Sequence, residues 1–192
     1  MLMKELILKN RTCRRFYGDK KIAIEQLREL VELARLSPSG GNVQPMKYAL
    51  ICTPEMNAKV YDTLRWAAYF KDWDGPVESE RPTAYIILLR ERAISKQLTW
   101  DDGIFCQSIY LGASEIGLGG CIIGNIVKNK LKEVINIGSE YDISLVIALG
   151  YPKEQVIIEE IGEDGDVKYW RDDENIHHVP KRKLKDLIVR EF

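Results

Sequence analysis

Two apolar runs without a charged residue, at 84–89 and 143–150, constrain this chain most strongly. Each has the length of a β-strand, and a strand that is apolar at every position must be covered on both faces. We therefore expect 84–89 to be a central strand that is covered on both faces, and 143–149 to be a buried strand. Neither run is long enough to cross a bilayer, and the sequence predicts no membrane span and no signal peptide.

Apolar residues at helical spacing predict an amphipathic helix over 24–36, which ends at Ser37 and Pro38. Small and apolar residues on nearly every side of 99–116 predict a helix that is buried all round, against another helix or another subunit. The remaining expected elements are a loop at 37–45, a strand at 48–52, a helix near 127–135, and a helix that begins at Pro54 and has its buried stripe at Met56, Val60, Leu64 and Ala67. Up to residue 150 these elements predict one layered α/β arrangement, without a repeat or a linker.

The segments 66–82 and 153–192 have a different character. The first mixes aromatic, turn and charged residues, which is typical of a lid or a pocket wall rather than a core element. In the second, 156–161 and 167–170 flank an acidic turn that contains a glycine, and this pattern indicates a β-hairpin. A short basic segment then predicts the start of a helix after Pro180.

Charge is unevenly distributed along the chain. The 28 basic and 29 acidic residues give a net charge of -1, which argues against a globally basic nucleic-acid-binding protein. Residues 1–21 nevertheless hold seven basic and two acidic side chains, a net of +5, and residues 180–192 hold five and two, a net of +3. Residues 153–174 carry nine acidic and three basic side chains, a net of -6.

Solvated surface is one explanation for such charge runs. The alternative is that the two basic ends meet around a phosphate, whose oxygens match the planar donor fork of arginine. Neither basic end interleaves aromatic residues with its charges, so we expect no stacking surface for nucleic acid.

Side chains that act as catalysts on their own are scarce. The four cysteines, at positions 13, 52, 106 and 121, form no CxxC pair, which indicates reduced thiols of a cytoplasmic protein and no zinc site. His177 and His178 are adjacent, in an acidic stretch that we expect to be exposed, and supply no metal site. Among the cysteines, Cys13 is the best nucleophile candidate because arginines flank it, but an ordinary packed cysteine is the favoured interpretation. Asp101 or Asp102 is expected to cap a helix.

The glycine-rich segment 117–125 does not match a nucleotide-binding fingerprint. Counted from Gly117, the third glycine of the dinucleotide pattern is replaced by Ile122, and the segment follows a predicted helix rather than a strand. The sequence also lacks a GxxxxGK[ST] phosphate loop and a GxSxG nucleophile motif. We therefore expect the chemistry to belong to a bound cofactor.

Four short motifs, taken in order, resemble those of the nitroreductase family of FMN-dependent oxidoreductases. They are Arg-Thr-Cys-Arg-Arg-Phe at 11–16, Pro-Ser-Gly-Gly-Asn-Val-Gln-Pro at 38–45, Gly-Leu-Gly through Gly at 117–124, and Gly-Tyr-Pro at 150–152. The resemblance implies an α+β fold, a three-layer α/β/α sandwich whose mostly antiparallel central sheet is flanked by helices. It also implies that 1–192 is a single FMN-binding domain, with the hairpin and acidic extension at 153–180 inside it. The family is homodimeric, and the helix at 99–116 would lie in the dimer core.

The same resemblance implies an FMN site at the subunit interface. Arg11, Thr12 and Arg14 would hold the phosphate and the ribityl chain. Lys181 and Arg182 would close on the phosphate from the other end of the chain, although the sequence does not separate them from Arg171 and Lys183. The backbone amides of Ile123 and Gly124 would lie beside the flavin N5 edge, where hydride arrives and leaves. The residues that would reach the flavin from the partner subunit are Pro38, Ser39, Gly40 and Asn42.

The activity implied is that of an FMN-dependent NAD(P)H oxidoreductase with ping-pong hydride transfer, from nicotinamide to flavin and on to a nitroaromatic, quinone or similar acceptor. The chemistry is then the flavin's, with no catalytic side chain and no metal. The alternatives are a reductive dehalogenase or a flavin-degrading enzyme of the same fold, or a flavin-binding module without turnover. The sequence leaves open the acceptor, the choice between NADH and NADPH, and whether 66–82 moves.

Overall fold

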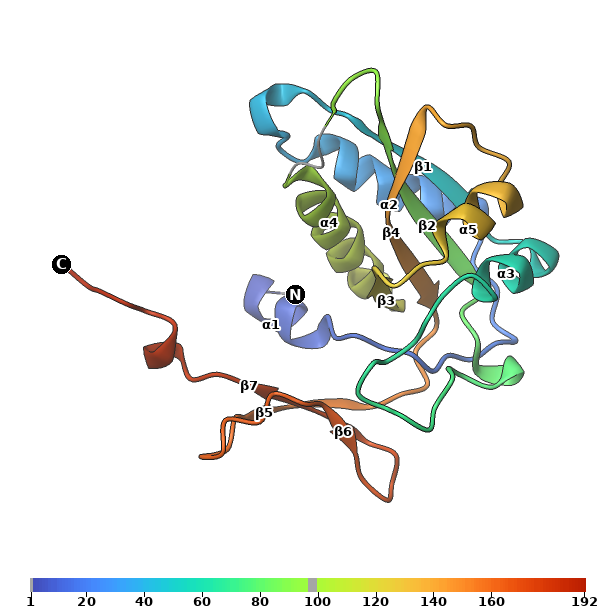
Figure 1. Cartoon of the computed structure of the whole chain (residues 1–192). Coiled ribbons are helices and arrows are strands. Elements are labelled where there is room, and N and C mark those ends of the chain that lie inside the picture. The colour runs from blue at the N-terminus through green and yellow to red at the C-terminus, as the bar shows by residue number, and fades with distance from the viewer. Residues whose placement is uncertain (1, 97–99) are drawn as a thin grey trace.

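A four-stranded antiparallel sheet forms the centre of the protein in the computed structural model, which describes residues 2–96 and 100–192 (Figure 1). Its strand order is β1 (Met46–Ile51), β2 (Ala84–Glu91), β4 (Tyr141–Gly150) and β3 (Gly119–Ile123). The two uncharged runs fall in β2 and β4, which pair with each other in the middle of the sheet. The predictions of a central strand at 84–89 and of a buried strand at 143–149 are therefore confirmed.

Helices cover both faces of this sheet (Figure 1). Residues Ile86 and Leu88 of β2 pack with α2 (Ile24–Leu36) and α4 (Asp101–Glu115). Alternate residues of the same strand, Tyr85 and Ile87, pack on the other side with α3 (Pro54–Tyr61) and α5 (Lys128–Val134). The short helix α1 (Met3–Lys9) lies beside α4. The predicted three-layer α+β sandwich is confirmed.

Two of the predicted helices differ from the structure. The helix over 24–36 has the expected bounds, but α3 ends at Tyr61, so Leu64 and Ala67 lie beyond it. Both are buried in the segment that follows α3, where Leu64 forms an isolated β-bridge with Ile126 and Ala67 has a positive φ of 35°, and their burial mimics a helical stripe. Residue 99 of the helix predicted over 99–116 lies outside the described residues, and α4 covers Asp101–Glu115. Within one chain α4 lies against one side of the sheet and its Ile104 is 39% exposed, so burial on every side would require another subunit.

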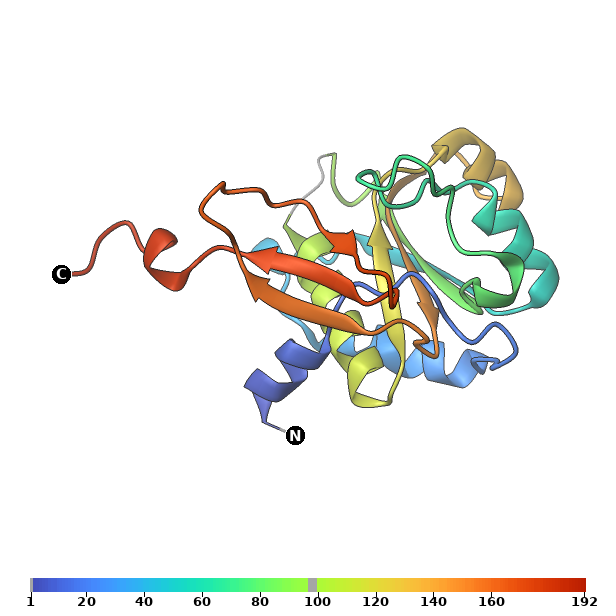
Figure 2. The same ribbon diagram turned by 90° about the horizontal axis from the view of Figure 1, so that it is seen from below.

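Residues 153–181 form a second, three-stranded sheet that lies in front of α4 and β3 when the molecule is seen from below (Figure 2). The order is β5 (Val156–Glu160), β7 (His177–Lys181) and β6 (Trp170–Arg171). The predicted hairpin of β5 and β6 is therefore wrong, because β7 lies between them, parallel to β5 and antiparallel to β6. Its sequence, His-His-Val-Pro-Lys, has too little apolar alternation to be recognised as a strand.

The last eleven residues extend away from the body of the molecule in both views (Figures 1 and 2). The predicted helix after Pro180 is absent from this part of the structure, where the chain forms only the 3₁₀ turn η3 (Leu184–Asp186). Leu184 and Leu187 remain largely exposed, and a short helix without packing gains too little to form. The other 3₁₀ turns are η1 (Gly40–Asn42) and η2 (Glu78–Glu80).

In residues 2–96 and 100–192, no helix is long and apolar enough to cross a membrane. The same residues contain no group of three or more His, Cys, Asp or Glu side chains placed to hold a metal ion. All four cysteines are free thiols.

Candidate functional site

The N-terminal motif at 11–16 runs along the edge of the central sheet. The backbone N–H of Cys13 donates to Gly120 O of β3 at 2.7 Å, and Tyr110 donates its hydroxyl to Arg11 O at 2.7 Å. Phe16 is fully buried against Gly150, where a Cβ atom would lie only 2.6 Å from the Phe16 ring. These contacts fix the motif in place, and Gly150 allows the close approach.

Side chains from both ends of the chain line one hollow beside this motif, which we name the Arg14 hollow, of about 340 Å³. Arg11, Thr12 and Arg14 come from the N-terminal motif, and Lys181 comes from the end of β7. The remaining lining residues are Asn10, Gln107, Tyr110, Ile122, Tyr169, His177 and Val179. The structure thus brings together four of the five residues expected at a phosphate, and Arg182 does not line this hollow.

The guanidinium of Arg14 is buried without a carboxylate of its own. The residue is 8% exposed, and its Nε and Nη1 atoms have no hydrogen-bond partner. Its central carbon lies 4.6 Å from the centroid of the Tyr169 ring. Arg11 donates from Nη2 to Ile7 O at 2.8 Å, but its buried Nε also has no partner. A buried donor without an acceptor costs roughly 1–3 kcal/mol, so these atoms are suited to an anion in the hollow.

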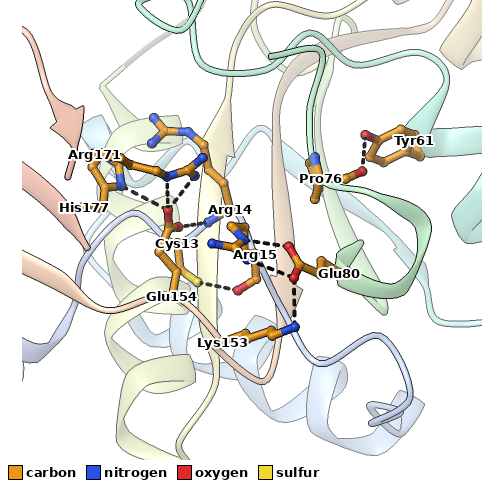
Figure 3. Close-up of polar contacts among 10 residues, drawn as sticks. All are labelled: Cys13, Arg14, Arg15, Tyr61, Pro76, Glu80, Lys153, Glu154, Arg171 and His177. Carbon is orange, nitrogen blue, oxygen red and sulfur yellow. Dashed lines mark hydrogen bonds and ion pairs between the residues drawn. The ribbon is translucent and has the colours of Figure 1, made fainter. Parts of the chain in front are cut away.

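Glu154 connects the N-terminal motif to the second sheet (Figure 3). Its side chain has no exposed area, and its carboxylate accepts the backbone N–H of Arg14 at 2.7 Å. Arg171 donates to it from Nε at 3.0 Å and from Nη2 at 2.6 Å, while His177 Nδ1 lies 3.4 Å away. Burial alone would raise the pKa of Glu154, but the hydrogen bonds and the Arg171 charge lower it to about 2. Arg171 is therefore committed to a carboxylate and not to the Arg14 hollow.

A second carboxylate holds the next residue of the motif (Figure 3). Glu80 accepts hydrogen bonds from Arg15 Nε at 2.6 Å and from Lys153 Nζ at 2.8 Å. The hydrogen bond from Arg15 is the main reason why the pKa of Glu80 falls to about 2. Arg15 thus anchors the motif to η2, while Arg14 is left for the hollow.

A second hollow, of about 140 Å³, adjoins the first one. We name it the Gly124 hollow, because Ile123 and Gly124 at the end of β3 line it. Arg14 and Tyr169 line both hollows, so the two are neighbours. A backbone bond from Arg65 N–H to Asn125 O at 3.0 Å holds the opposite wall.

The Pro-Ser-Gly-Gly loop lies at the other end of α4. Asp101 is fully buried and accepts the Ser39 hydroxyl at 2.5 Å and the Gly40 N–H at 2.8 Å, so it anchors this loop. The expectation that Asp101 caps the helix is therefore corrected, since its carboxylate faces the loop. Asp102 accepts the Gly103 N–H at 2.8 Å and the Ser144 hydroxyl. Within one chain, Pro38, Ser39, Gly40 and Asn42 line neither of the two hollows.

Comparison with known proteins places the chain in a family. The family model described as the nitroreductase family matches residues 7–151. The chain belongs to this family. The matched residues span α1 to the end of β4 and include the Arg14-bearing motif and the glycine-rich segment.

The nitroreductase relatives agree with this assignment. An oxygen-insensitive NADPH nitroreductase of Helicobacter acinonychis is 25% identical over 180 residues, covering 77% of this chain and 86% of that protein. A nitroreductase family protein from Streptococcus pneumoniae has a TM-score of 0.70 at 18% identity and covers 100% of both chains. An FMN-dependent nitroreductase from Clostridium difficile has a TM-score of 0.64 at 21% identity, covering 80% of this chain and 89% of that one. The structural likenesses show the nitroreductase fold.

The structure confirms the packed-cysteine interpretation of Cys13 and corrects the expected exposure of His177. Cys13 is buried and donates its thiol to Arg15 O at 3.1 Å, and burial together with the charge of Glu154 raises its pKa to about 12. It is a packed cysteine rather than a nucleophile. His177 is fully buried rather than exposed, and His178 faces the other side of β7, where it stacks on Trp170 at 4.1 Å between ring centroids.

Sequence reasoning missed three residues of this candidate site, namely Glu154, Tyr169 and His177. Glu154 lies two residues after the Gly-Tyr-Pro motif, inside a strongly acidic stretch. Such a stretch is typical of solvated surface, so the sequence did not single out Glu154. Tyr169 and His177 carry no motif, and only the contacts across the second sheet reveal them.

Proposed function

We propose that this chain is an FMN-dependent NAD(P)H oxidoreductase that works as a homodimer. The observation that carries the proposal is that the buried Nε atoms of Arg11 and Arg14, two residues that line one hollow, both lack an acceptor. A phosphate supplies acceptor oxygens for such donors. The Clostridium difficile neighbour is named for its dependence on FMN, which supports the same cofactor.

Four side chains would hold the FMN phosphate and ribityl chain, namely Arg11, Thr12, Arg14 and Lys181. Arg182 is outside the lining of the hollow, and Lys183 lies 3.7 Å from Glu160, so we assign the role to Lys181. The ammonium of Lys181 would add a charge from the C-terminal end of the chain. This is the meeting of the two basic ends that their charge pattern suggests.

The flavin ring would lie toward the Gly124 hollow, beside the backbone of Ile123 and Gly124. FMN, when bound, supplies the hydride chemistry: it accepts hydride from NADH or NADPH and delivers it to the acceptor. A backbone donor near the ring stabilises negative charge without adding a titrating group. Tyr110 keeps this region in place through its hydroxyl, which stays protonated because burial raises its pKa.

A second copy of the chain would complete the site. Pro38, Ser39, Gly40 and Asn42 would approach the flavin from the partner subunit, because they lie outside both hollows of their own chain. Exposed apolar side chains on α2 and α4, Leu36 at 65% and Ile104 at 39%, would be covered in the dimer. We also propose that 1–192 acts as one domain, with the second sheet as part of it.

The acceptor would enter from a wide aromatic hollow of about 750 Å³, lined by 69–73 and 166–171. Tyr69, Phe70 and Trp73 lie on one side, and Tyr169 and Trp170 on the other. Tyr169 also lines the Arg14 and Gly124 hollows, so this space adjoins the proposed flavin. Aromatic walls favour planar acceptors such as nitroaromatics and quinones.

The test is the visible spectrum of the purified protein, followed by anaerobic titration with NADH and NADPH. We expect the bands of oxidised flavin, their loss on addition of a nicotinamide, and their return with a nitroaromatic or quinone. A protein that stays colourless after incubation with FMN contradicts the proposal. Turnover of a halotyrosine but not of nitroaromatics identifies the dehalogenase alternative, and a flavin that no nicotinamide reduces identifies a binding module.

A further inference from the structure

A separate hollow of about 240 Å³ lies between α3, η2 and the start of β2. We name it the Tyr85 hollow. It shares no lining residue with the Arg14 and Gly124 hollows. Its lining residues are Gly18, Lys21, Cys52, Pro54, Asn57, Ala58, Tyr61, Glu78, Arg81, Pro82, Thr83 and Tyr85. The proposed flavin chemistry leaves these residues without a role.

Three buried polar atoms of this hollow have no hydrogen-bond partner. They are the hydroxyl of Tyr85, Nε of Arg81 and Oδ1 of Asn57. Tyr85 is fully buried in the middle of the protein, so open solvent does not reach its hydroxyl. Buried polar atoms in native proteins are nearly always paired with a protein group, water or a ligand, so three unpaired ones make this hollow a candidate binding site.

Neighbouring groups hold the side chains of Asn57 and Arg81 in place. Asn57 donates from Nδ2 to Thr83 O at 2.7 Å, which leaves Oδ1 as an acceptor. The guanidinium carbon of Arg81 lies 3.9 Å from the centroid of the Tyr61 ring. Tyr61 in turn donates its hydroxyl to Pro76 O at 2.9 Å (Figure 3).

The wall of the hollow is held by backbone contacts. Gly18 donates its N–H to Ser79 O at 3.0 Å, and a Cβ at Gly18 would lie 2.7 Å from that oxygen. Thr83 donates its hydroxyl to Lys20 O at 2.9 Å. The shape of the hollow therefore exists before any ligand binds, which lowers the entropic cost of binding.

The lining defines the chemistry of the ligand. The two cations of the lining, Arg81 and Lys21, outnumber its one carboxylate, Glu78, and favour an anion. Tyr85 supplies an O–H donor, since burial raises its pKa and keeps it protonated. Asn57 Oδ1 requires an N–H or O–H donor on the ligand. Pro54, Ala58 and Pro82 offer apolar contact for a carbon skeleton. The volume is below the usual range for drug-sized ligands, so the molecule is small.

We propose that the Tyr85 hollow binds a small carboxylic acid that also carries a hydroxyl or amino group. The carboxylate lies against Arg81 and Tyr85, and the hydroxyl or amino group donates to Asn57. The carbon skeleton distinguishes this ligand from inorganic phosphate, which has no apolar group to contact Pro54, Ala58 and Pro82.

The test is an NMR titration of the ¹⁵N-labelled, FMN-loaded full chain with L-lactate. Propionate, which lacks the hydroxyl, and inorganic phosphate are titrated in parallel. We expect lactate to shift the Asn57 side-chain amide saturably and to bind more tightly than either comparison ligand. Weaker binding of lactate than of phosphate, or equal binding of lactate and propionate, overturns the proposal. No shift with any probe overturns it as well, because the hollow then holds water only.

Variants locate the binding. Arg81→Gln should weaken lactate binding roughly tenfold or more, because an ion pair is lost, and Tyr85→Phe roughly three- to tenfold, because a hydrogen bond from a neutral hydroxyl to the carboxylate is lost. Tyr85→Phe removes a hydroxyl that has no protein partner, so the variant should fold at least as stably as the parent. The matched control is Tyr48→Phe on β1, outside this hollow, which should leave lactate binding unchanged. Unchanged binding in both Arg81→Gln and Tyr85→Phe overturns the assignment.

Discussion

Replacement of Glu154 by glutamine tests whether this carboxylate joins the N-terminal motif to the second sheet. In the wild-type protein it accepts hydrogen bonds from Arg14 and Arg171 and has no exposed side-chain area. The fall of its pKa from an ordinary 4.5 to about 2 corresponds to stabilisation of its charged form by roughly 3 kcal/mol. Loss of one partner of a buried ion pair costs a similar amount, about 3–5 kcal/mol. We therefore expect Glu154→Gln to lower the free energy of unfolding by about 3 kcal/mol at pH 7.

The effect should depend on pH in a defined direction. Because the folded-state pKa of Glu154 is depressed, its contribution is fully present above the ordinary value of 4.5 and is lost as the pH falls toward about 2. The difference in unfolding free energy between wild type and Glu154→Gln should therefore be constant from pH 7 to 5. It should shrink below about pH 4.5 and nearly vanish at about pH 2.

Urea unfolding followed by tryptophan fluorescence, without added FMN, measures this difference at each pH. The matched control is Glu32→Gln, which removes an exposed ion pair with Arg35 and should change the free energy of unfolding much less, because solvent screens that pair. A Glu154→Gln difference that is no larger than the control, or that is the same at pH 3 as at pH 7, would refute this reasoning.

Three further outcomes are expected. Lys181→Ala should weaken FMN binding roughly tenfold or more, as measured by flavin fluorescence, whereas Arg182→Ala should change it less than about twofold. Equal effects of the two substitutions would contradict the assignment of Lys181. Cys13 should resist iodoacetamide at pH 8 in the folded protein and react only in urea, because its pKa is about 12; rapid alkylation of the folded protein would restore it as a nucleophile. Gly150→Ala should destabilise the protein by about 1–3 kcal/mol in thermal unfolding, since the new methyl group meets a buried ring. Its control, Gly103→Ala in an open helical position, should stabilise by up to about 1 kcal/mol.

Local patterns predicted the central layers of the fold well. The uncharged runs became β2 and β4, and the amphipathic stretch became α2 with the expected bounds. In these segments the periodicity of burial follows directly from the sequence. The helix from Pro54 ended earlier than its stripe suggested, because residues that follow a helix can be buried at spacings that mimic one.

Local sequence patterns did not predict the second sheet, because the burial of its side chains depends on partners that are distant in the sequence. An acidic residue such as Glu154 is typical of a protein surface, yet its side chain is buried by contacts with Arg14 and Arg171. His177 is buried beside the same carboxylate and the ring of Tyr169. A polar side chain is stable inside a protein only with such partners, and no local spacing reveals them.

The sequence motifs predicted many of the residues that line the candidate site. Arg11, Thr12, Arg14 and Lys181 do share a hollow, as expected for a phosphate site. The glycine-rich segment placed Ile123 and Gly124 beside a neighbouring hollow. The sequence did not separate Lys181 from Arg171, because only the structure shows that Arg171 is bonded to Glu154.

Binding of FMN compared with riboflavin tests the central claim most directly, because the two ligands differ only in the phosphate. Isothermal titration should show that the wild-type protein prefers FMN to riboflavin by at least about a hundredfold, and that Arg14→Ala removes at least about tenfold of that preference. Riboflavin affinity itself should change little in the variant. If wild type binds the two flavins equally, or if Arg14→Ala leaves the preference intact, the Arg14 hollow is not a phosphate site.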